Sequence, residues 1–309
     1  MRNTFLTTLV DLAAHDARIC LVVGDLGFSV VEPFRDRFGP RFLNAGIAEQ
    51  NMTGVAAGMA MTGCKVFTYS IANFPTLRCL EQIRNDICYH GADVTVVAVG
   101  GGLAYGALGY SHHAVQDLAC LRGFPGLRLA TPADPFETIA VVRYLCSHPG
   151  PNYLRLGKGG EPHLHVAPPE IPGPGPIIIR PGAGRAILAC GTAAAVAMEA
   201  AAADDTAVFS CPIWDESAAC HEAIIRCVAG YRRVVTVEDH LVAGGFGSFV
   251  RECLETRPDL QARVRCCALD ASVCGHVAGP ARLRELGGVT AARLRALLDT
   301  AHVGETCAG

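Results

Sequence analysis

The feature that most constrains this chain is a regular alternation of short apolar runs with stretches of helical spacing. The run 94–99 (VTVVAV) is typical of a buried strand and leads into glycines, and the run 19–23 (ICLVV) leads into Gly24 and Asp25. Strands that are separated by helices form right-handed crossovers in a mainly parallel sheet. We therefore predict an α/β fold whose ligands gather at loops beyond the carboxyl ends of the strands. In this sequence those loops are 24–29, 70–74 and 100–112.

A stretch dense in proline and glycine, 167–176, interrupts the alternation and can sustain neither a helix nor a central strand. The alternation resumes beyond it, and a length of 309 residues suits two domains. We predict two doubly wound domains, the first over 1–165 and the smaller second over 181–309, joined by a linker over 166–180.

The composition excludes several classes of function. The formal net charge is −3 without a run rich in Lys or Arg, so nothing favours binding to nucleic acid or an anionic membrane. Aromatic residues make up 6% of the chain, too few for a base-stacking platform. The 15 cysteines show no C-x-x-C spacing, so we expect small buried hydrophobic residues and no metal site. The N-terminus does not resemble a signal peptide, and we expect a soluble, cytoplasmic enzyme.

Two residues are candidates for chemistry. Glu49 begins an otherwise apolar helical stretch, where it is either a partly exposed first-turn carboxylate that the helix dipole favours, or a buried carboxyl that can donate a proton. His112 follows a glycine-rich loop and is either a solvated imidazole or an acid–base group at the mouth of the sheet. The residues alone leave both questions open.

Other polar clusters are expected to be solvated. His163 and His165 lie just before the Pro/Gly-rich stretch, and 238–240 (EDH) ends a predicted strand. The glycines at 100–102 and 244–247 form neither G-x-G-x-x-G nor a phosphate loop that ends in Gly-Lys-Ser/Thr. These glycines therefore do not predict a nucleotide-binding loop.

The run 44–52 (NAGIAEQNM), followed by 54–60 (GVAAGMA), strongly resembles the pyrimidine-binding domain of transketolase, as found in split, two-subunit transketolases. The resemblance continues through 81–85 (EQIRN), 131–134 (TPAD) and 236–240 (TVEDH), and so covers nearly the whole chain. It implies a thiamine-diphosphate pyrimidine-binding domain followed by a transketolase C-terminal domain, and an enzyme that transfers a two-carbon ketol unit between sugar-phosphate-like substrates.

The resemblance also assigns residues to the cofactor. It implies that Glu49 is catalytic, because the matching glutamate hydrogen-bonds N1′ of the aminopyrimidine and favours its imino tautomer. Phe74 matches an aromatic residue that stacks on the pyrimidine, and the position of a second aromatic residue falls near Ile71. The remaining residues expected at the cofactor are Asp25, Leu26 and Ile47.

On the substrate side, the resemblance implies that Arg2, Ser29 and Arg155 hold the sugar phosphate and that His112 contacts substrate hydroxyls near the reacting carbons. A guanidinium group suits this task because it binds phosphate oxygens in a bidentate fashion. Two positions depart from the family. Leu108 replaces an aspartate, and Gly100 replaces a histidine that contacts phosphate. A changed or less oxygenated substrate is therefore expected.

The family binds Mg²⁺ and the diphosphate through a Gly-Asp-Gly motif, which this chain lacks because Leu26 follows Gly24 and Asp25. We expect a separate N-terminal transketolase subunit to supply that site, with activity only in the complex and self-association into a heterotetramer. Three alternatives remain: a β subunit of a 2-oxoacid dehydrogenase, a deoxyxylulose-phosphate-synthase-like enzyme, and a non-catalytic scaffold subunit.

Overall fold

The computed structural model describes residues 1–300, and a single twisted sheet runs through them. Its eleven strands follow the order β11-β10-β8-β9-β5-β6-β4-β3-β1-β2, with β7 paired to β9. The strands of the first half are β1 (Ile19–Val23), β2 (Phe42–Asn44), β3 (Lys65–Ile71), β4 (Val94–Val99), β5 (Arg128–Ala130) and β6 (Asn152–Leu156). Those of the second half are β7 (Gly175–Arg180), β8 (Arg185–Cys190), β9 (Ala207–Trp214), β10 (Arg233–Leu241) and β11 (Val264–Leu269).

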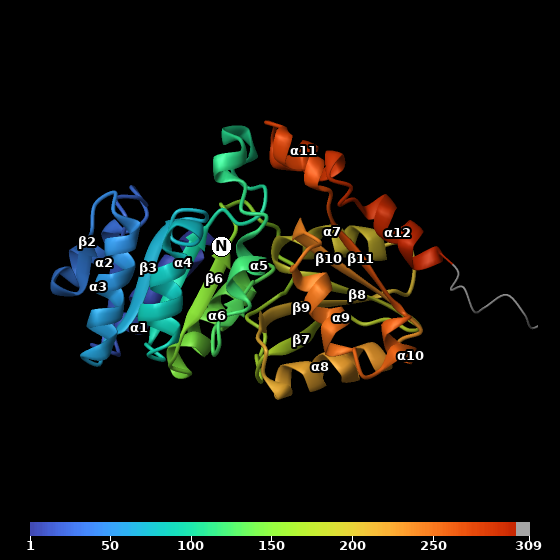
Figure 1. The fold of residues 1–309 in the computed structure, drawn as a ribbon, viewed down its shortest axis with the longest axis horizontal. Helices are drawn as coiled ribbons and strands as arrows, with labels where there is room; N and C mark the ends of the chain where they lie inside the picture. The colour runs from blue at the N-terminus through green and yellow to red at the C-terminus, as the bar shows by residue number, and fades with distance from the viewer. Residues whose placement is uncertain (301–309) are drawn as a thin grey trace, which may run out of the picture.

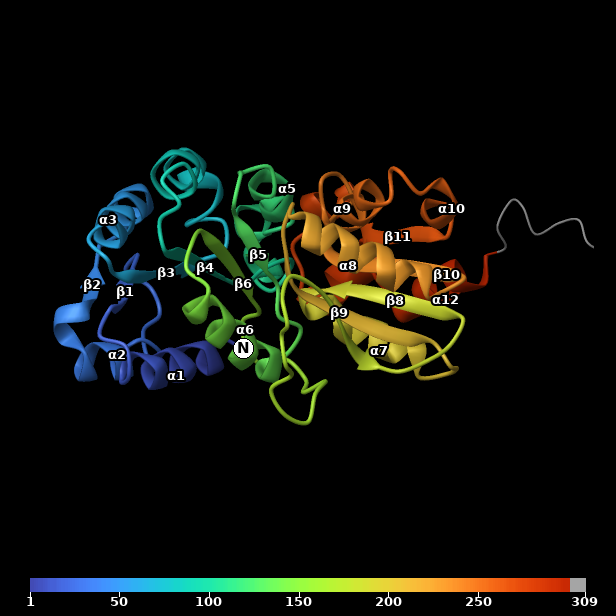
Figure 2. The ribbon, with the colours of Figure 1, turned by 90° about the horizontal axis from the view of Figure 1, so that it is seen from below.

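Helices cover both faces of this sheet (Figures 1 and 2). The helices of the first half are α1 (Arg2–Ala13), α2 (Glu32–Arg37), α3 (Glu49–Met61), α4 (Leu80–Gln82), the π-helix η3 (Ile83–Cys88), α5 (Asp117–Leu121) and α6 (Pro135–Ser147). Those of the second half are α7 (Ala194–Ala201), α8 (Ala218–Ala229), α9 (Phe246–Cys253), α10 (Pro258–Gln261), α11 (Pro280–Leu286) and α12 (Ala291–Asp299). The short 3₁₀ turns are η1 (Gly39–Arg41), η2 (Leu77–Cys79), η4 (Gly106–Leu108), η5 (Tyr110–His112), η6 (Gly191–Ala193) and η7 (Ala271–Gly275).

The two faces of the sheet are packed differently. Helices α3, α5, α8 and α9 lie on one face, where one hydrophobic core extends from Cys20 in β1 to Val264 in β11. On the other face, α1 and α6 cover a core of the first half, and α7 and α12 cover a separate core of the second half. The halves therefore share one extended core on the first face, whereas on the second face each half has its own core, to which the other half adds only a few residues.

The two expected domains are joined more closely than the sequence suggests. Strand β5 of the first half pairs antiparallel with β9 of the second half, with Leu129 opposite Trp214 and Ala130 opposite Ile213. The second part of the expected linker 166–180 is not a linker, because residues 175–180 form β7 and hydrogen-bond to β9. The segment 157–174 contains no helix or strand.

Parallel pairing brings the carboxyl ends of β1, β3, β4 and β6 to the same edge of the first half. The loops at 24–29, 70–74 and 100–112 follow the first three of these strands. The loop 100–112 also reaches the second half at the top of Figure 1, because Gly106 packs against Leu283 of α11. None of the helices within residues 1–300 is long and apolar enough to cross a membrane.

Candidate active site

Glu49 is the first residue of α3, and its side chain is only 3% exposed. Its Oε2 accepts a hydrogen bond from Nη1 of Arg78 at 3.0 Å, and the Arg78 side chain is 54% exposed. The buried alternative for Glu49 is therefore the correct one. The cation beside this buried carboxylate is half-exposed, so the ion pair lies between the interior and the solvent.

The surroundings of Glu49 contain hydrogen-bonding groups that the protein leaves unused. A Cβ atom added to Gly24 would lie 3.6 Å from Glu49 Cγ, Met52 Sδ and Ser70 Oγ, so the glycine leaves a small recess beside the carboxylate. Ser70 Oγ and Thr68 Oγ1 are buried and find no hydrogen-bond partner among residues 1–300. A buried polar group without a partner is costly, and a ligand with ring nitrogens and an amino group fits this recess.

An aromatic row, formed by Phe74, His112 and Tyr105, begins beside Glu49. The guanidinium carbon of Arg78 lies 5.6 Å from the centroid of Phe74. The edge-to-face contacts that follow join Phe74 to His112 at 5.4 Å and His112 to Tyr105 at 6.3 Å between ring centroids. The row ends where Lys158 Nζ lies 4.9 Å from the Tyr105 centroid. It therefore leads from a buried carboxylate to an exposed ammonium group.

Tyr105 explains why position 100 is glycine. A Cβ atom there would lie 2.1 Å from Cε2 of Tyr105, and the backbone of Gly100 has a φ of 86°. The tyrosine ring thus occupies the space into which a side chain at residue 100 would point. Leu108, further along the same loop, is 57% exposed. Neither residue offers the carboxylate or imidazole that the family pattern has at these positions.

The loop after β1 carries three of the expected residues, two of them in unusual backbone conformations. Asp25 and Ser29 have φ angles of 53° and 65°. Asp25 is fixed by Asn44, whose Nδ2 donates to Oδ1 of Asp25 at 2.9 Å, and Ser29 N donates to Oε1 of Glu32 at 2.9 Å. Leu26 is half-buried between them. The strained conformations are typical of a loop that a ligand or partner approaches.

Around this site, several apolar side chains are exposed. Ile47, just before Glu49, is 81% exposed, and Phe28 in the loop after β1 is 71% exposed. Ile71, at the end of β3, is half-buried. Arg2 is half-buried at the start of α1, and its charge opposes the burial that raises the pKa of Tyr105. Arg2 therefore acts electrostatically on Tyr105, the last ring of the aromatic row.

Arg155 lies elsewhere and is 5% exposed. Its Nε donates to Asp117 Oδ2 at 2.8 Å, and its Nη2 donates to the carbonyl oxygens of Ala114 and Asp239 at 2.8 and 3.0 Å. Burial and these partners hold Nε and Nη2 of the guanidinium inside the protein, so the structure gives no support to the expected phosphate contact. An exposed cation instead stands three residues later, at Lys158, which no motif in the sequence singles out.

Of the residues expected to be solvated, His163 is exposed and His165 is half-buried, but Glu238, Asp239 and His240 are buried. Glu238 is 1% exposed and accepts hydrogen bonds from the amides of Phe246 and Gly247 at 2.7 and 2.8 Å, and burial raises its pKa to about 8. The amide of His165 donates to Asp134 Oδ2 at 2.9 Å, and its Nδ1 lies 3.3 Å from the same oxygen. The first set of interactions encloses Glu238 within the second half, and the second set fastens the segment after β6 to the start of α6.

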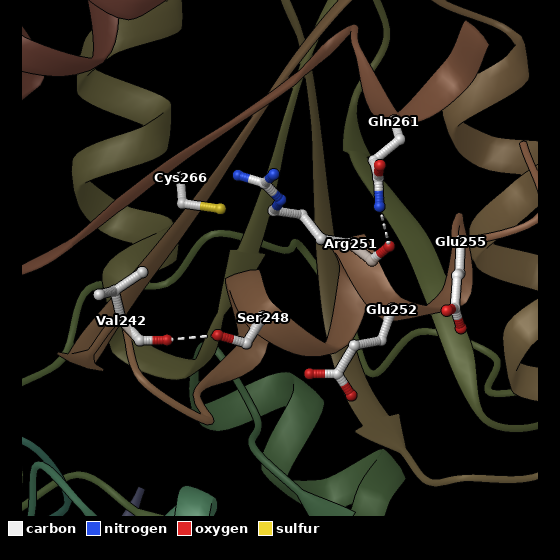
Figure 3. A pocket seen from close by; sticks show the side chains of 7 residues that line it. All are labelled: Val242, Ser248, Arg251, Glu252, Glu255, Gln261 and Cys266. Atoms are coloured by element: carbon white, nitrogen blue, oxygen red, sulfur yellow. Dashed lines mark hydrogen bonds between the residues drawn. The ribbon is translucent and has the colours of Figure 1, made fainter. Parts of the chain in front are cut away.

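A separate cavity of about 490 Å³ lies in the second half (Figure 3). Ser248 Oγ donates to the carbonyl of Val242 at 2.5 Å there, and Gln261 donates to the carbonyl of Arg251 at 3.0 Å. It brings together none of the residues expected at a site. Within residues 1–300, no group of three or more His, Cys, Asp or Glu side chains could hold a metal ion.

Comparison with known proteins identifies both halves of the chain. Residues 1–160 match the family "Transketolase, pyrimidine binding domain", and residues 177–294 match "Transketolase, C-terminal domain". A solved structure described as a split gene transketolase, inactive beta4 tetramer, superimposes with a TM-score of 0.82 at 31% identity, covering 96% of each chain.

Among curated relatives, one of the subunits of the apulose-4-phosphate transketolase of Phocaeicola vulgatus is 34% identical over 263 residues, which are 83% of this chain and 84% of the relative. The 1-deoxy-D-xylulose-5-phosphate synthase of Bordetella petrii is also 34% identical, but the match covers only 39% of that protein. The chain therefore belongs to the transketolase family, and it has the two-domain build of the pyrimidine-binding subunit of a split transketolase.

Proposed function

We propose that this chain supplies the pyrimidine-side half of the active site of a two-subunit transketolase and that Glu49 is its catalytic carboxylate. The observation that carries the proposal is a buried Glu49 whose half-exposed partner Arg78 also contacts the first ring of the aromatic row. When bound, thiamine diphosphate supplies the nucleophilic carbon and the electron sink that ketol transfer requires. Glu49 would hold a proton at N1′ of the pyrimidine, and Phe74 would stack on that ring.

Asp25, Leu26, Ile47 and Ile71 are the further residues that we propose around the cofactor. Asp25 and Leu26 lie on the loop after β1, and Ile71 ends β3 beside it. Ile47 directly precedes the helix of Glu49 and is exposed. A partly apolar wall of this kind would orient the pyrimidine by excluding water from its faces.

For the substrate, we propose that His112 contacts hydroxyl groups and that Arg2, Ser29 and Lys158 hold the anionic end. The support is their order along the molecule, because His112 is next to Phe74, while Lys158 and Arg2 are at the far end of the row. Leu108 and Tyr105 stand where polar groups were expected. A phosphorylated ketose that lacks a hydroxyl, or is branched, near the reacting carbons would leave fewer polar groups unpaired there.

The other half of the active site would come from an N-terminal subunit that carries the diphosphate and Mg²⁺ site. No Gly-Asp-Gly motif occurs in this sequence, and the exposed Phe28 and Ile47 beside the site are the kind of apolar surface that a partner covers. A pair of each subunit, giving a heterotetramer, is the assembly that we propose. A scaffold without catalysis would have no need for the buried Glu49.

The proposal is tested by reconstitution. The chain alone should bind thiamine diphosphate weakly and show no turnover. Adding a subunit that carries Gly-Asp-Gly should give tight, Mg²⁺-dependent binding and ketol transfer from a phosphorylated ketose. Tight cofactor binding by this chain alone, measured by calorimetry, would contradict the half-site. Transfer of a pyruvate-derived unit instead of a ketol unit would favour the deoxyxylulose-phosphate-synthase-like alternative.

A further inference from the structure

A second cavity, of about 330 Å³, lies between the two halves of the molecule. The first half contributes the loop after β4, with Gly101, and the segment after β6, with Lys158. The second half contributes Thr192 from η6, Asp239 from β10 and Arg284 from α11. Its volume suits a small ligand. The cavity exists only because the shared sheet holds the two halves side by side.

Two cations that line this cavity lack a close anionic partner among the described residues. The guanidinium of Arg284 donates no hydrogen bond to any of residues 1–300, and its one ion pair is the long contact of Nη1 with Asp239 Oδ2 at 4.0 Å. Its side chain is 27% exposed, so the guanidinium is half-sheltered. Lys158 has only the ring of Tyr105 beneath it in the same part of the chain. Guanidinium and ammonium groups in this state are suited to binding a phosphate.

The cavity also holds an unpaired acceptor. Asp239 has a side chain that is 3% exposed, and its Oδ1 finds no hydrogen-bond partner among residues 1–300. Its Oδ2 is 3.4 Å from the amide of Leu103, a weak contact. A buried carboxylate oxygen without a donor is costly, so a hydroxyl group of a ligand at this point would be stabilising.

The remaining acidic group does not cancel the positive charge. Glu161, at the rim, accepts from the amino group of Met1 at 2.8 Å and from the amide of Gly159 at 2.7 Å, so its charge is already balanced. The remaining charged groups in the lining are the negative carboxylate of Asp239 and the positive side chains of Lys158 and Arg284. The cavity therefore keeps an excess of positive charge beside one acceptor.

We propose that this interdomain cavity binds the phosphate group of a small hydroxylated molecule, with Arg284 and Lys158 on the phosphate and Asp239 accepting from a hydroxyl. Because Lys158 also ends the aromatic row, the phosphate belongs either to the substrate itself or to a separate effector. The first case rests on the proposed function. In both cases, the C-terminal domain supplies a ligand-binding residue.

The binding experiment uses the full chain without thiamine diphosphate, so that its result does not depend on the proposed catalytic function. Glycerol 3-phosphate, inorganic phosphate and glycerol are titrated by calorimetry. Glycerol 3-phosphate should bind most tightly and glycerol not measurably. Arg284→Gln should weaken the phosphate ligands about tenfold, as expected when a charged hydrogen bond is lost. Arg282→Gln, on the same helix but paired with Glu285 at 3.0 Å, is the matched control and should bind normally.

Asp239→Asn should abolish the preference for glycerol 3-phosphate over inorganic phosphate, because the acceptor for the hydroxyl is weakened. If Arg284→Gln does not fold, Arg284→Lys replaces it and should weaken binding by a smaller factor. Equal binding by wild type and Arg284→Gln would overturn the proposal, as would a loss shared by Arg282→Gln. Glu49→Gln should bind these ligands normally, which separates this site from the catalytic one.

The reconstituted complex then identifies the source of the phosphate. If Arg284→Gln raises the KM of the phosphorylated substrate and leaves kcat unchanged, the cavity holds the phosphate of the substrate. If the KM is unchanged while calorimetry shows lost binding, the ligand is a separate effector.

Discussion

The molecule contains two buried glutamates, Glu49 and Glu238, in opposite environments. Glu49 is 3% exposed and touches one half-exposed arginine at the mouth of a recess. Glu238 is 1% exposed, and both of its oxygens accept hydrogen bonds from backbone amides at the start of α9. The Glu49 carboxylate therefore has one side-chain partner, at the border with the solvent. The Glu238 carboxylate has both oxygens bonded to backbone amides in the interior.

The difference shows that burial by itself does not mark a catalytic group. The sealed region around Glu238 also contains Arg155 and Asp117, whose ion pair at 2.8 Å is almost inaccessible. The open region around Glu49 leads along the aromatic row to an exposed lysine. We therefore expect substitutions in the open region to change catalysis and substitutions in the sealed region to change stability.

The largest effect is expected for Glu49→Gln in the reconstituted enzyme. The variant keeps the shape of the side chain but loses the carboxyl that holds a proton on the cofactor, so kcat should fall by about 10²–10⁴-fold. Thermal unfolding of this chain should stay close to wild type. Near-normal turnover would contradict the role of Glu49.

In the sealed region, Arg155→Met should lower the free energy of unfolding. It leaves the Asp117 carboxylate buried without its cation, and breaking a buried ion pair in this way costs about 3–5 kcal/mol. Chemical denaturation should show the loss, and Arg155→Lys should recover only part of it, because a single ammonium nitrogen cannot occupy the positions of both Nε and Nη2. An unchanged stability together with a raised KM for the phosphorylated substrate would instead return Arg155 to the substrate site.

At the other end of the open region, Lys158→Met should raise the KM of the phosphorylated substrate about tenfold with little change in stability. The side chain is exposed, so its loss should not disturb the packing. Lys158→Arg is the conservative control and should keep a KM within a few-fold of wild type. An equal fall in the affinity for a neutral substrate analogue would show that the effect is not due to charge.

Leu108→Asp tests the substrate preference. The exposed leucine offers no acceptor for a sugar hydroxyl, whereas aspartate does, so kcat/KM should shift toward ordinary pentose phosphates. The expected shift is about tenfold relative to a deoxygenated phosphorylated substrate. If wild type already prefers pentose phosphates by a wide margin and the ratio does not move, the interpretation of this loop is wrong.

The smallest effect concerns pH. Burial raises the pKa of Glu238 from 4.5 to about 8 and that of Glu137 from 4.5 to about 7, so the folded state retains protons that the unfolded state releases. The contribution of these protons to stability is complete below pH 4.5 and is lost as the pH rises to about 8. The Tm should therefore fall over this range of pH.

Glu238→Gln should show a shallower fall of the Tm in that range, because its neutral amide does not ionise, although it loses one backbone hydrogen bond at every pH. Differential scanning calorimetry checks the slope, with the exposed Glu222→Gln as the control. A slope equal to that of wild type would mean that Glu238 is not the group that titrates.

Local patterns in the sequence are enough to define the family, the alternation of strands and helices, and the position of Glu49, although strand β7 was expected to be part of a linker. The apolar run at 94–99 is recognisable as a strand from its immediate neighbours, and the motif around Glu49 is contiguous. Such patterns could not show whether Glu49 is solvated or buried. Its recess is also formed by Gly24, which follows β1, and by Ser70, which lies in β3.

The fold decides which charged groups are available to a ligand. Arg155 and Lys158 are only three residues apart. Arg155 is buried and donates hydrogen bonds to Asp117 and to the carbonyl of Asp239, which are distant in sequence, whereas Lys158 remains exposed. The pairing of β5 with β9 likewise joins residues more than 80 positions apart. Burial and strand pairing both depend on contacts between residues that are distant in sequence. The junction between the two halves and the cavity beside it could therefore be found only in the folded chain.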